Sequence, residues 1–211
     1  MSRDNILHKV RTALGRSAGQ GVEDVPPVRL RIPETPLEER IAVMRARIET
    51  LAGVTARVPD MNAAREYVQA AIAGKTAVAS NSPYLADCGI STLPGVCCGI
   101  HDVGEMREVS ARVDIGITSA DYALGDTGTL VMLSSPAEAR LVSLLPPAHL
   151  AVVPVERILT GLDELFTLLP NPAEQTSSMV LITGPSRTAD IEQILVRGVH
   201  GPGQITVVIV G

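Results

Sequence analysis

The apolar residues of positions 2–14 recur at helical spacing, and Gly15 follows the last of them. This pattern predicts a short amphipathic helix that ends at the glycine. Residues 16–33 are rich in Gly, Pro and charged residues, which indicates a flexible arm. We therefore expect an N-terminal helix and arm at 1–35 and a single α/β domain at 36–211. The first helix either docks on a partner or a second subunit, or folds back on its own domain.

A second apolar stripe predicts a longer helix that begins near residue 36. Its members follow a 4-3-4-3 spacing, which places them on one face against a core: Leu37, Ile41, Met44, Ile48 and Leu51. We expect Thr35 to cap this helix, with Pro36 in its first turn and Glu38 completing a capping box.

From residue 54 onward, short apolar runs alternate with helical patterns. The expected strands are 54–58, 76–79, 96–100, 113–117, 128–133, 150–155, 179–183 and 205–210. The expected helices between them run from a cap at Asp60 to Gly74, over 137–145 and over 158–169. Continuous Val, Ile and Leu runs separated by helices are typical of buried parallel strands. The fold class is therefore α/β, a mostly parallel sheet with flanking helices and an N-terminal helical extension.

Composition narrows the class of protein. The 211 residues carry a formal net charge of −5 and scattered basic residues, and only 2% are aromatic, which argues against nucleic-acid binding. The polar N-terminus leads into no signal-peptide core. Apolar runs stay shorter than the roughly 20 residues of a membrane helix. We expect a cytoplasmic protein with no membrane span.

The cysteine count and the absent motifs argue against a bound cofactor. There are three cysteines and four dispersed histidines, which is too few thiolates for an iron–sulfur cluster and offers no zinc spacing. The glycine motifs of dinucleotide and P-loop sites are missing. We expect no cofactor and no metal in this chain. Cys97 and Cys98 fall in a predicted strand and are interpreted as buried small hydrophobes.

The richest polar segment spans residues 118–129. It combines carboxylates, hydroxyls and glycines between two predicted strands, and in open α/β sheets ligands bind outside the carboxyl ends of strands. Asp121 is a candidate catalytic residue. The candidate anion-binding residues of this segment are Thr118, Asp126, Thr127, Gly128 and Thr129. The alternative interpretation is a tight connection in which Asp and Thr cap turns.

A second polar segment, 184–192, follows a predicted strand and is expected to open a helix. Backbone N–H groups at such a start would suit an anion, and the arginine adds a charge. The candidates are Gly184, Ser186, Arg187 and Thr188 for anion binding, and Glu192 for catalysis. Alternatively this is a capped helix start with Arg187 paired to a nearby carboxylate. A nucleophile elbow is disfavoured because Thr188 stands in place of its last glycine.

The third candidate segment is the glycine-flanked loop 198–203, just before the last strand. His200 in this loop would act as an acid, a base or a hydrogen-bond donor. The alternative is a histidine bonded to a neighbouring carbonyl group. Arg140 and His149 flank residues 144–147 and are weaker candidates.

Taken together, these segments resemble the LUD-domain family. Residues 114–130 (DIGITSADYALGDTGTL) and 143–149 (SLLPPAH) are similar to its central signature. Residues 184–192 (GPSRTADIE) and 198–202 (GVHGP) resemble its C-terminal signature. The similarity covers roughly residues 54–211, and the N-terminal helix with its Pro-rich arm is typical of the short C-type members.

The resemblance implies a fold of the isomerase, CoA-transferase and formyltetrahydrofolate cyclo-ligase type. It also implies a role in bacterial oxidation of L-lactate to pyruvate, beside two iron–sulfur partner proteins that carry the redox centres. This chain lacks the extra cysteines of the family's redox-active member, so the electron-transfer role does not carry over to it.

Three functions remain open. In the first, the chain is a non-redox subunit of a lactate-oxidising system, in which Arg187 binds an anionic metabolite and His200 or Asp121 acts as a base. In the second, it is a stand-alone enzyme for a small acid, CoA or nucleotide-type substrate, with Glu192 or Asp121 as nucleophile or base. In the third, it is a binding module that uses its N-terminal helix. A homo-oligomer is compatible with each.

Overall fold

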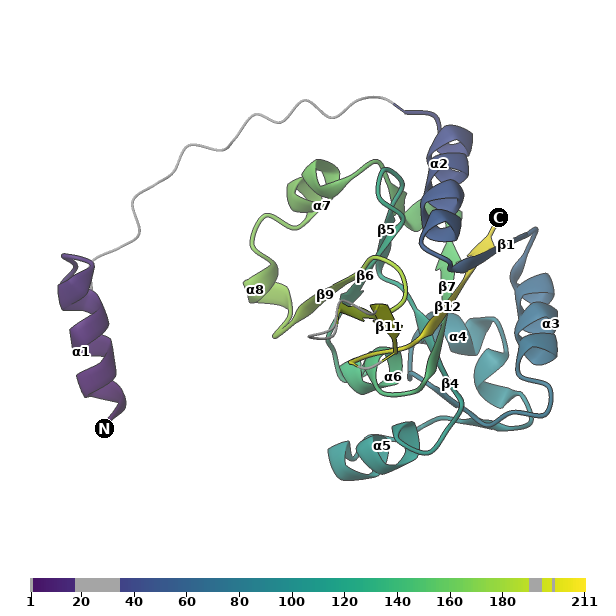
Figure 1. Ribbon diagram of the computed structural model, residues 1–211, viewed down its shortest axis with the longest axis horizontal. Coiled ribbons are helices and arrows are strands. Elements are labelled where there is room, and N and C mark those ends of the chain that lie inside the picture. Colours follow the sequence, from purple (N-terminus) through teal and green to yellow (C-terminus); the bar gives the residue numbers. More distant parts are fainter. Residues whose placement is uncertain (1, 18–34, 190–194, 199) are drawn as a thin grey trace. The chain divides into compact units, whose positions relative to one another are not determined.

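The computed structural model describes residues 2–17, 35–189, 195–198 and 200–211 (Figure 1). The chain divides into two compact units, Met1–Arg31 and Ile32–Gly211, and each is described by itself. In the first unit, α1 spans Arg3–Ala13, and the Asn5 backbone N–H donates to the Ser2 hydroxyl. The helix expected over 2–14 is confirmed. Most of the expected arm at 16–33 lies outside the described residues.

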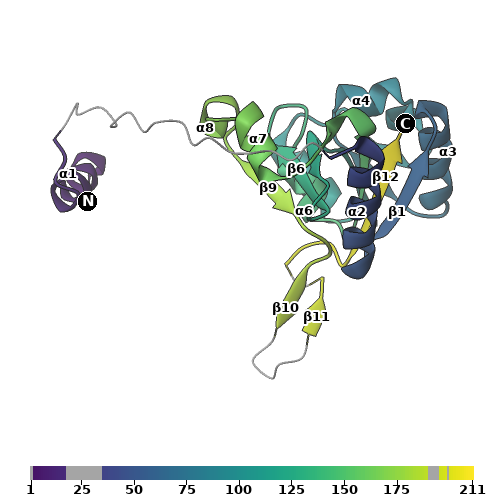
Figure 2. The ribbon, with the colours of Figure 1, turned by 90° about the horizontal axis from the view of Figure 1, so that it is seen from above.

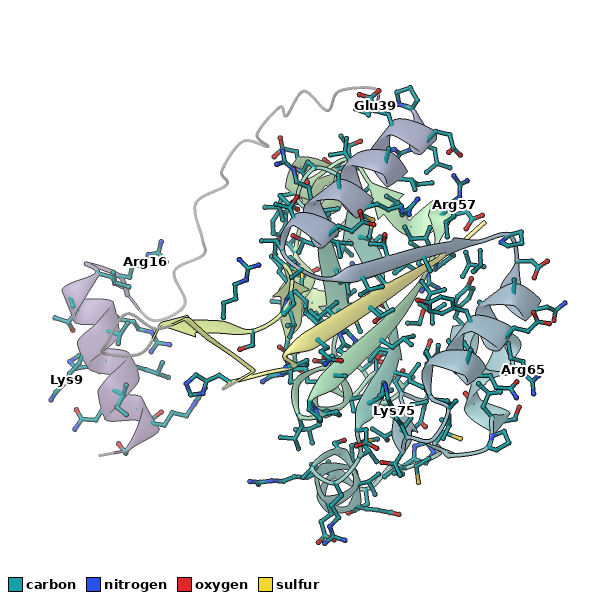
Figure 3. All side chains as sticks on the ribbon, turned by 45° about the vertical axis from the view of Figure 1, so that its right-hand side comes forward. Lys9, Arg16, Glu39, Arg57, Arg65 and Lys75 are labelled. Atoms are coloured by element: carbon teal, nitrogen blue, oxygen red, sulfur yellow. The ribbon has the colours of Figure 1, made fainter. Side chains whose placement is uncertain are left out.

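In the second unit, α2 (Leu37–Thr50) confirms the predicted apolar stripe, because Ile41, Met44 and Ile48 are buried. The predicted cap is wrong. Pro36 occupies the N-cap position, and no described side chain caps the helix there. The Glu38 carboxylate instead pairs with Arg57, whose Nη1 lies 2.6 Å from Glu38 Oε2. Arg57 lies beside α2 in Figure 3, so this pair ties the helix to the neighbouring strand.

The described part of the chain forms a parallel sheet of six strands, which confirms the predicted fold class (Figure 1). In spatial order the strands are β1 (Val54–Val58), β12 (Gln204–Val210), β7 (Ala148–Pro154), β4 (Ile115–Ser119), β2 (Ala77–Ala79) and β3 (Val96–Cys97). Each neighbouring pair runs parallel. All six carboxyl ends therefore lie at one edge of the sheet.

Both faces of the parallel sheet are covered. One face packs against α3 (Met61–Ala71), α4 (Pro83–Asp87) and the 3-10 turn η1 (Ile90–Thr92). Asp60 caps α3 as predicted, since the Ala63 N–H donates to its carboxylate at 2.8 Å. The other face packs against α2 and a second sheet, with α5 (Val103–Ser110) and α6 (Arg140–Leu144) covering its remaining part.

The second sheet was not expected from the sequence. Its described strands are β8 (Ile158–Leu159), β5 (Tyr122–Leu124), β6 (Thr129–Leu133) and β9 (Met179–Ile182), in that order. The segment 118–129 therefore contains a strand. The helix expected over 158–169 is also wrong at its start, where the 3-10 turn η2 (Val155–Arg157) leads into β8, and α7 spans only Leu162–Leu168. A short helix, α8 (Pro172–Gln175), precedes β9.

The helix expected to open in 184–192 is also wrong. Arg187–Ala189 form the strand β10, which pairs antiparallel with β11 (Leu195–Arg197). Local β-branched residues and cross-strand pairing outweigh the helix-start signal of Gly-Pro-Ser. This hairpin projects away from the two sheets in Figure 2.

The two vicinal cysteines differ from expectation as well. Cys97 and Cys98 are exposed, whereas Cys88 is buried. The reason is position, because β3 is a two-residue strand at the edge of the sheet and the chain leaves it at once. In the portion of the chain that the structure covers, no helix has the length and apolar character to cross a membrane.

Candidate functional site

The carboxyl edge of the parallel sheet brings polar residues of three central strands together. Ser80 and Ser82 follow β2, Ser119 ends β4, and Asp121 comes two residues later. Arg157 ends the 3-10 turn that follows β7. These positions lie outside the carboxyl ends of parallel strands, where open α/β sheets bind ligands.

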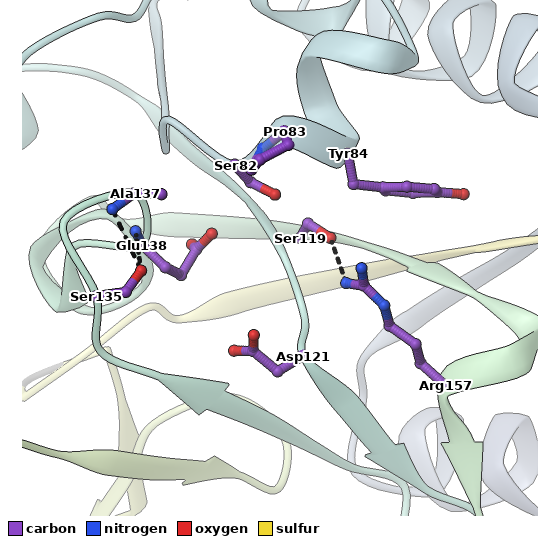
Figure 4. A pocket seen from close by; sticks show the side chains of 9 residues that line it. All are labelled: Ser82, Pro83, Tyr84, Ser119, Asp121, Ser135, Ala137, Glu138 and Arg157. Carbon is purple, nitrogen blue, oxygen red and sulfur yellow. Dashed lines mark hydrogen bonds between the residues drawn. The ribbon is translucent and has the colours of Figure 1, made fainter. Parts of the chain in front are cut away.

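The chain opens a crevice at this edge because it leaves adjacent strands in opposite directions. After β2 it enters α4, whose Leu85 packs on one face of the sheet. After β4 it enters β5, whose Ala123 packs on the other face. Between α4 and β5 lies a cavity of about 160 Å³, which we call the carboxyl-edge cavity (Figure 4). Its lining residues are Ser82, Pro83, Tyr84, Ser119, Asp121, Ser135, Ala137, Glu138 and Arg157.

Arg157 is the cation of this cavity. Its Nη1 donates to the Ser119 hydroxyl at 3.2 Å and to the Ala120 carbonyl at 3.0 Å. The guanidinium carbon lies 5.5 Å from the centre of the Tyr84 ring, within the range of a cation–π contact. Burial, more than any other cause, raises the pKa of Tyr84 to about 12. Because a guanidinium carries five N–H donors, these contacts orient Arg157 and leave it able to bind a carboxylate.

Glu138 is a buried carboxyl group on the opposite side of the cavity, with only 7% of its surface exposed. Its position is set locally by the Ser135 hydroxyl, which accepts from the Ala137 and Glu138 backbone N–H groups (Figure 4). The Ser80 hydroxyl donates to Glu138 Oε2 at 2.8 Å. Oε1 is buried, and no described residue makes a well-formed hydrogen bond to it, although the Ser119 backbone N–H lies near enough to lower the pKa of the carboxyl group.

Burial raises the pKa of Glu138 to about 8. The Ser80 hydrogen bond opposes this shift, the negative charge of Asp121 adds to it, and the positive charge of Arg157 reduces it. Near neutral pH Glu138 is therefore mostly a neutral acid, which can donate a hydrogen bond as well as accept one.

Asp121 supplies the second carboxyl group of the cavity. Its Oδ2 accepts from the Leu133 backbone N–H at 2.7 Å, because the antiparallel pairing of β5 with β6 brings Leu133 beside it. Burial raises the pKa of Asp121, and the hydrogen bond from Leu133 and the charge of Arg157 lower it in part. A cation, a neutral acid and a second carboxyl group thus face one small volume.

The predicted residues 126–129 lie at the other end of the β5–β6 hairpin, along the C-terminal half of α2. The Thr129 hydroxyl bonds those of Thr127 and Thr183 at 2.8 Å each. The Asp126 carbonyl accepts from Arg47 Nε at 3.1 Å. Gly128 has a φ of +70°, and a Cβ there would lie 2.9 Å from Ile48, so glycine permits this turn to approach the helix.

Two residues of the second predicted segment also contact the end of α2. Gly184 lies against the Leu51 side chain, and Arg187 Nη2 donates to the Leu51 carbonyl at 2.7 Å. Asp121 and the residues around Arg187 therefore lie at different ends of the β5–β6 hairpin, and the structure does not bring them together. Thr188 is described only as part of β10, and Glu192 lies outside the described residues.

Thr118 and His149 form a buried pair inside the sheet layer. Thr118 Oγ1 lies 2.8 Å from His149 Nε2, and both side chains are almost fully buried. Burial lowers the pKa of His149 to about 4, so the ring is neutral at physiological pH. Thr118 is thus committed to a core histidine and does not line the cavity.

His200 lies at the opposite edge of the parallel sheet from Arg157. It lines a cavity of about 350 Å³ with Leu144, Leu145, Pro147, Gly198 and Gly201. The Gly203 N–H donates to the Pro147 carbonyl at 2.9 Å. Pro147 directly precedes β7, and Gly203 directly precedes β12. Ser186 is at the base of the β10–β11 hairpin, where its N–H donates to the Pro202 carbonyl at 2.9 Å.

Sequence reasoning identified Asp121 of the carboxyl-edge cavity and missed Glu138 and Arg157. A usable signal existed for Arg157, because it follows the predicted strand 150–155 almost directly. Glu138 lies in the short loop after β6, and its approach to Ser80 depends on the second sheet, which local patterns do not encode.

Comparison with known proteins places the chain in a family. A family model for the LUD domain matches residues 41–210. "Lactate utilization protein C" of Exiguobacterium sp. is 40% identical over 108 residues, which cover 49% of this chain and 47% of that protein. The protein of the same name from Bacillus subtilis is 39% identical over 114 residues, covering 52% and 48%. The chain spans about half the length of the curated relatives it matches.

A solved structure has the same fold. The crystal structure of a DUF162 family protein from Deinococcus radiodurans superposes with a TM-score of 0.65, at 18% identity. The match covers 84% of this chain and 99% of that one. At this level of identity the likeness concerns the fold alone.

Proposed function

Because the chain belongs to the LUD-domain family, we propose that it takes part in lactate utilisation as a non-redox component that acts with iron–sulfur proteins in the cytoplasm. The names of its curated relatives support the pathway. The described residues include no group of three or more His, Cys, Asp or Glu side chains placed to hold a metal. In this proposal, electron transfer belongs to the iron–sulfur partner proteins.

We further propose that the carboxyl-edge cavity binds a small organic acid of this pathway. The observation that carries the proposal is the placement of Arg157 across from the buried Glu138 in a volume of about 160 Å³. Pockets for drug-sized ligands measure roughly 300–1,000 Å³, so the cavity matches a molecule of only a few heavy atoms. Arg187 is the competing cation, but it contacts the Leu51 carbonyl at the end of α2 and does not line this cavity.

Growth on lactate tests the role in the pathway. Three strains of the host organism are compared, in which the gene for this chain encodes the wild type, Arg157→Gln or Arg65→Gln. Arg65 donates to the Gly89 carbonyl away from the cavity, so its variant is a control for charge and surface. We expect slow growth on L-lactate, with normal growth on glucose, for Arg157→Gln alone. Wild-type growth on lactate without the gene would refute the proposal.

Co-purification tests the partner part of the same proposal. Tagged chain isolated from lactate-grown cells is expected to retain proteins that carry iron–sulfur absorption bands. Isolation of the chain without such proteins, under conditions that preserve a known iron–sulfur complex of the same cells, would remove the partners from the proposal.

A stand-alone enzyme for a small acid is the second candidate function. Two carboxyl groups with raised pKa values beside an arginine are the observation that favours it, since such shifts gather at catalytic sites. CoA and nucleotide-type substrates would have to extend well beyond the cavity. Turnover of a 2-hydroxy or 2-oxo acid by the purified chain alone would support this function over the first.

A further inference from the structure

Glu138 Oε1 is a buried polar atom that the fold leaves unmatched. Oε2 of the same carboxyl group accepts from the Ser80 hydroxyl, whereas no described residue makes a well-formed hydrogen bond to Oε1. A buried polar atom without a partner costs roughly 1–3 kcal/mol, so its persistence calls for an explanation such as a ligand. Figure 4 shows this carboxyl group extending from its loop toward the strand end that carries Ser119 and Asp121.

The position of the proton follows from the Ser80 contact. With the Ser80 hydroxyl donating to Oε2, a neutral Glu138 carries its proton on Oε1, which then requires an acceptor. The other groups on the cavity wall that carry charge or titrate are Asp121, Arg157 and Tyr84. Asp121 and Arg157 act on the Glu138 carboxyl in opposite directions, and Tyr84 has a pKa of about 12, so Tyr84 stays neutral over the pH range that matters.

We propose that the cavity selects short monocarboxylates with an oxygen on the adjacent carbon, that is, 2-hydroxy and 2-oxo acids. This inference rests on the proposed function and names the ligand class of the same site. Arg157 binds the carboxylate, and the Glu138 acid donates a hydrogen bond from Oε1 to the oxygen on C2. Binding then requires a protonated Glu138, so ligand binding and proton binding at the site are coupled.

The test measures the affinity of the purified full chain for L-lactate, pyruvate and propionate by isothermal titration calorimetry between pH 6 and pH 9. Propionate has the same carboxylate and no oxygen on C2. A neutral hydrogen bond contributes about 0.5–1.5 kcal/mol, so we expect lactate and pyruvate to bind roughly 3- to 10-fold more tightly than propionate. Above pH 8 the affinity for lactate should fall by about tenfold per pH unit.

Glu138 variants separate the effect of a donated hydrogen bond from the effect of cavity shape. Glu138→Gln keeps a donor and cannot titrate, so we expect it to prefer lactate over propionate at every pH. Glu138→Ala should bind the three acids alike. Glu66→Gln, on the exposed side of α3, is the matched control and should behave as wild type. Circular dichroism spectra of each variant verify that it is folded.

The outcomes distinguish this inference from the proposed function. Equal affinity of the wild type for lactate and propionate, or an unchanged pH dependence in Glu138→Gln, would overturn the inference while the anion site stands. Failure of all three acids to bind the wild type would refute the anion site itself.

Discussion

The charge of Asp121 adds to the proton affinity of Glu138, although the two residues come from different loops. The negative charge of Asp121 is one of the causes that raise the pKa of Glu138. In Asp121→Asn the amide oxygen can still accept from the Leu133 N–H, so the local fold is kept and only the charge is lost.

We therefore expect Asp121→Asn to shift the pH midpoint of lactate binding downward from about 8 by a fraction of a pH unit or more. Removing a neighbouring negative charge makes the Glu138 proton easier to lose. Calorimetric titrations at several pH values measure the midpoint. A midpoint that stays in place, or that rises, would show that the two carboxyl groups are not coupled.

His149 makes the stability of the fold depend on pH. Its folded pKa of about 4 lies below the value of 6.5 for the free side chain. A depressed histidine pKa contributes stability that is fully present above pH 6.5 and is lost as pH falls toward 4, because the unfolded state takes up the proton first. The full loss amounts to about 3 kcal/mol.

His149→Gln should therefore reduce the loss of stability on acidification between pH 6.5 and pH 4, since the amide keeps a partner for Thr118 and does not titrate. Urea unfolding at pH 4.5 and pH 7 gives the free energy of unfolding for each protein. His101→Gln, at an exposed site, is the control and should lose stability as the wild type does. Equal losses in all three would rule out His149 as the source.

Among the elements, β4 and α6 are in closer contact than any side chain would allow. A Cβ built on Gly116 of β4 would lie 1.8 Å from the Val142 carbonyl oxygen of α6. Backbone atoms cannot rotate away, so the helix would have to move. This contact keeps α6, and the loop that carries Glu138 before it, against the sheet.

Gly116→Ala is expected to lower the free energy of unfolding by about 1–3 kcal/mol or more, which is the usual cost of overpacking. It should also weaken lactate binding, because Glu138 lies two residues before α6. Gly201→Ala is the control, since its Cβ would meet Ser186 at an ordinary 3.5 Å. If both variants denature at the same urea concentration as the wild type, the close contact between β4 and α6 does not contribute to stability as we expect.

The parallel strands were predictable from sequence, and the second sheet was not. Runs such as 207–210 are apolar throughout and lie buried between two layers, so the local pattern suffices. Strands β5 and β8 have only three and two residues. Their strand character comes from pairing with distant partners, which no local pattern reports.

For the molecule as a whole, the same reason explains the candidate site. Asp121 is visible from the sequence because it lies in a polar segment after a strand. Glu138 becomes a site residue only because the second sheet returns the chain to the carboxyl edge beside Ser80. The cluster around Arg187 has residue types that suit an anion site, but it packs against the end of α2.

The central claim is that Arg157 holds the carboxylate of a small acid at the carboxyl edge of the parallel sheet. The most direct test is calorimetric titration of L-lactate into wild type, Arg157→Gln, Arg187→Gln and the control Arg65→Gln at pH 7. A hydrogen bond to a charged group contributes about 1.5–3 kcal/mol, so we predict at least a tenfold loss of affinity for Arg157→Gln alone. Wild-type affinity in Arg157→Gln, or a loss confined to Arg187→Gln, would contradict the account.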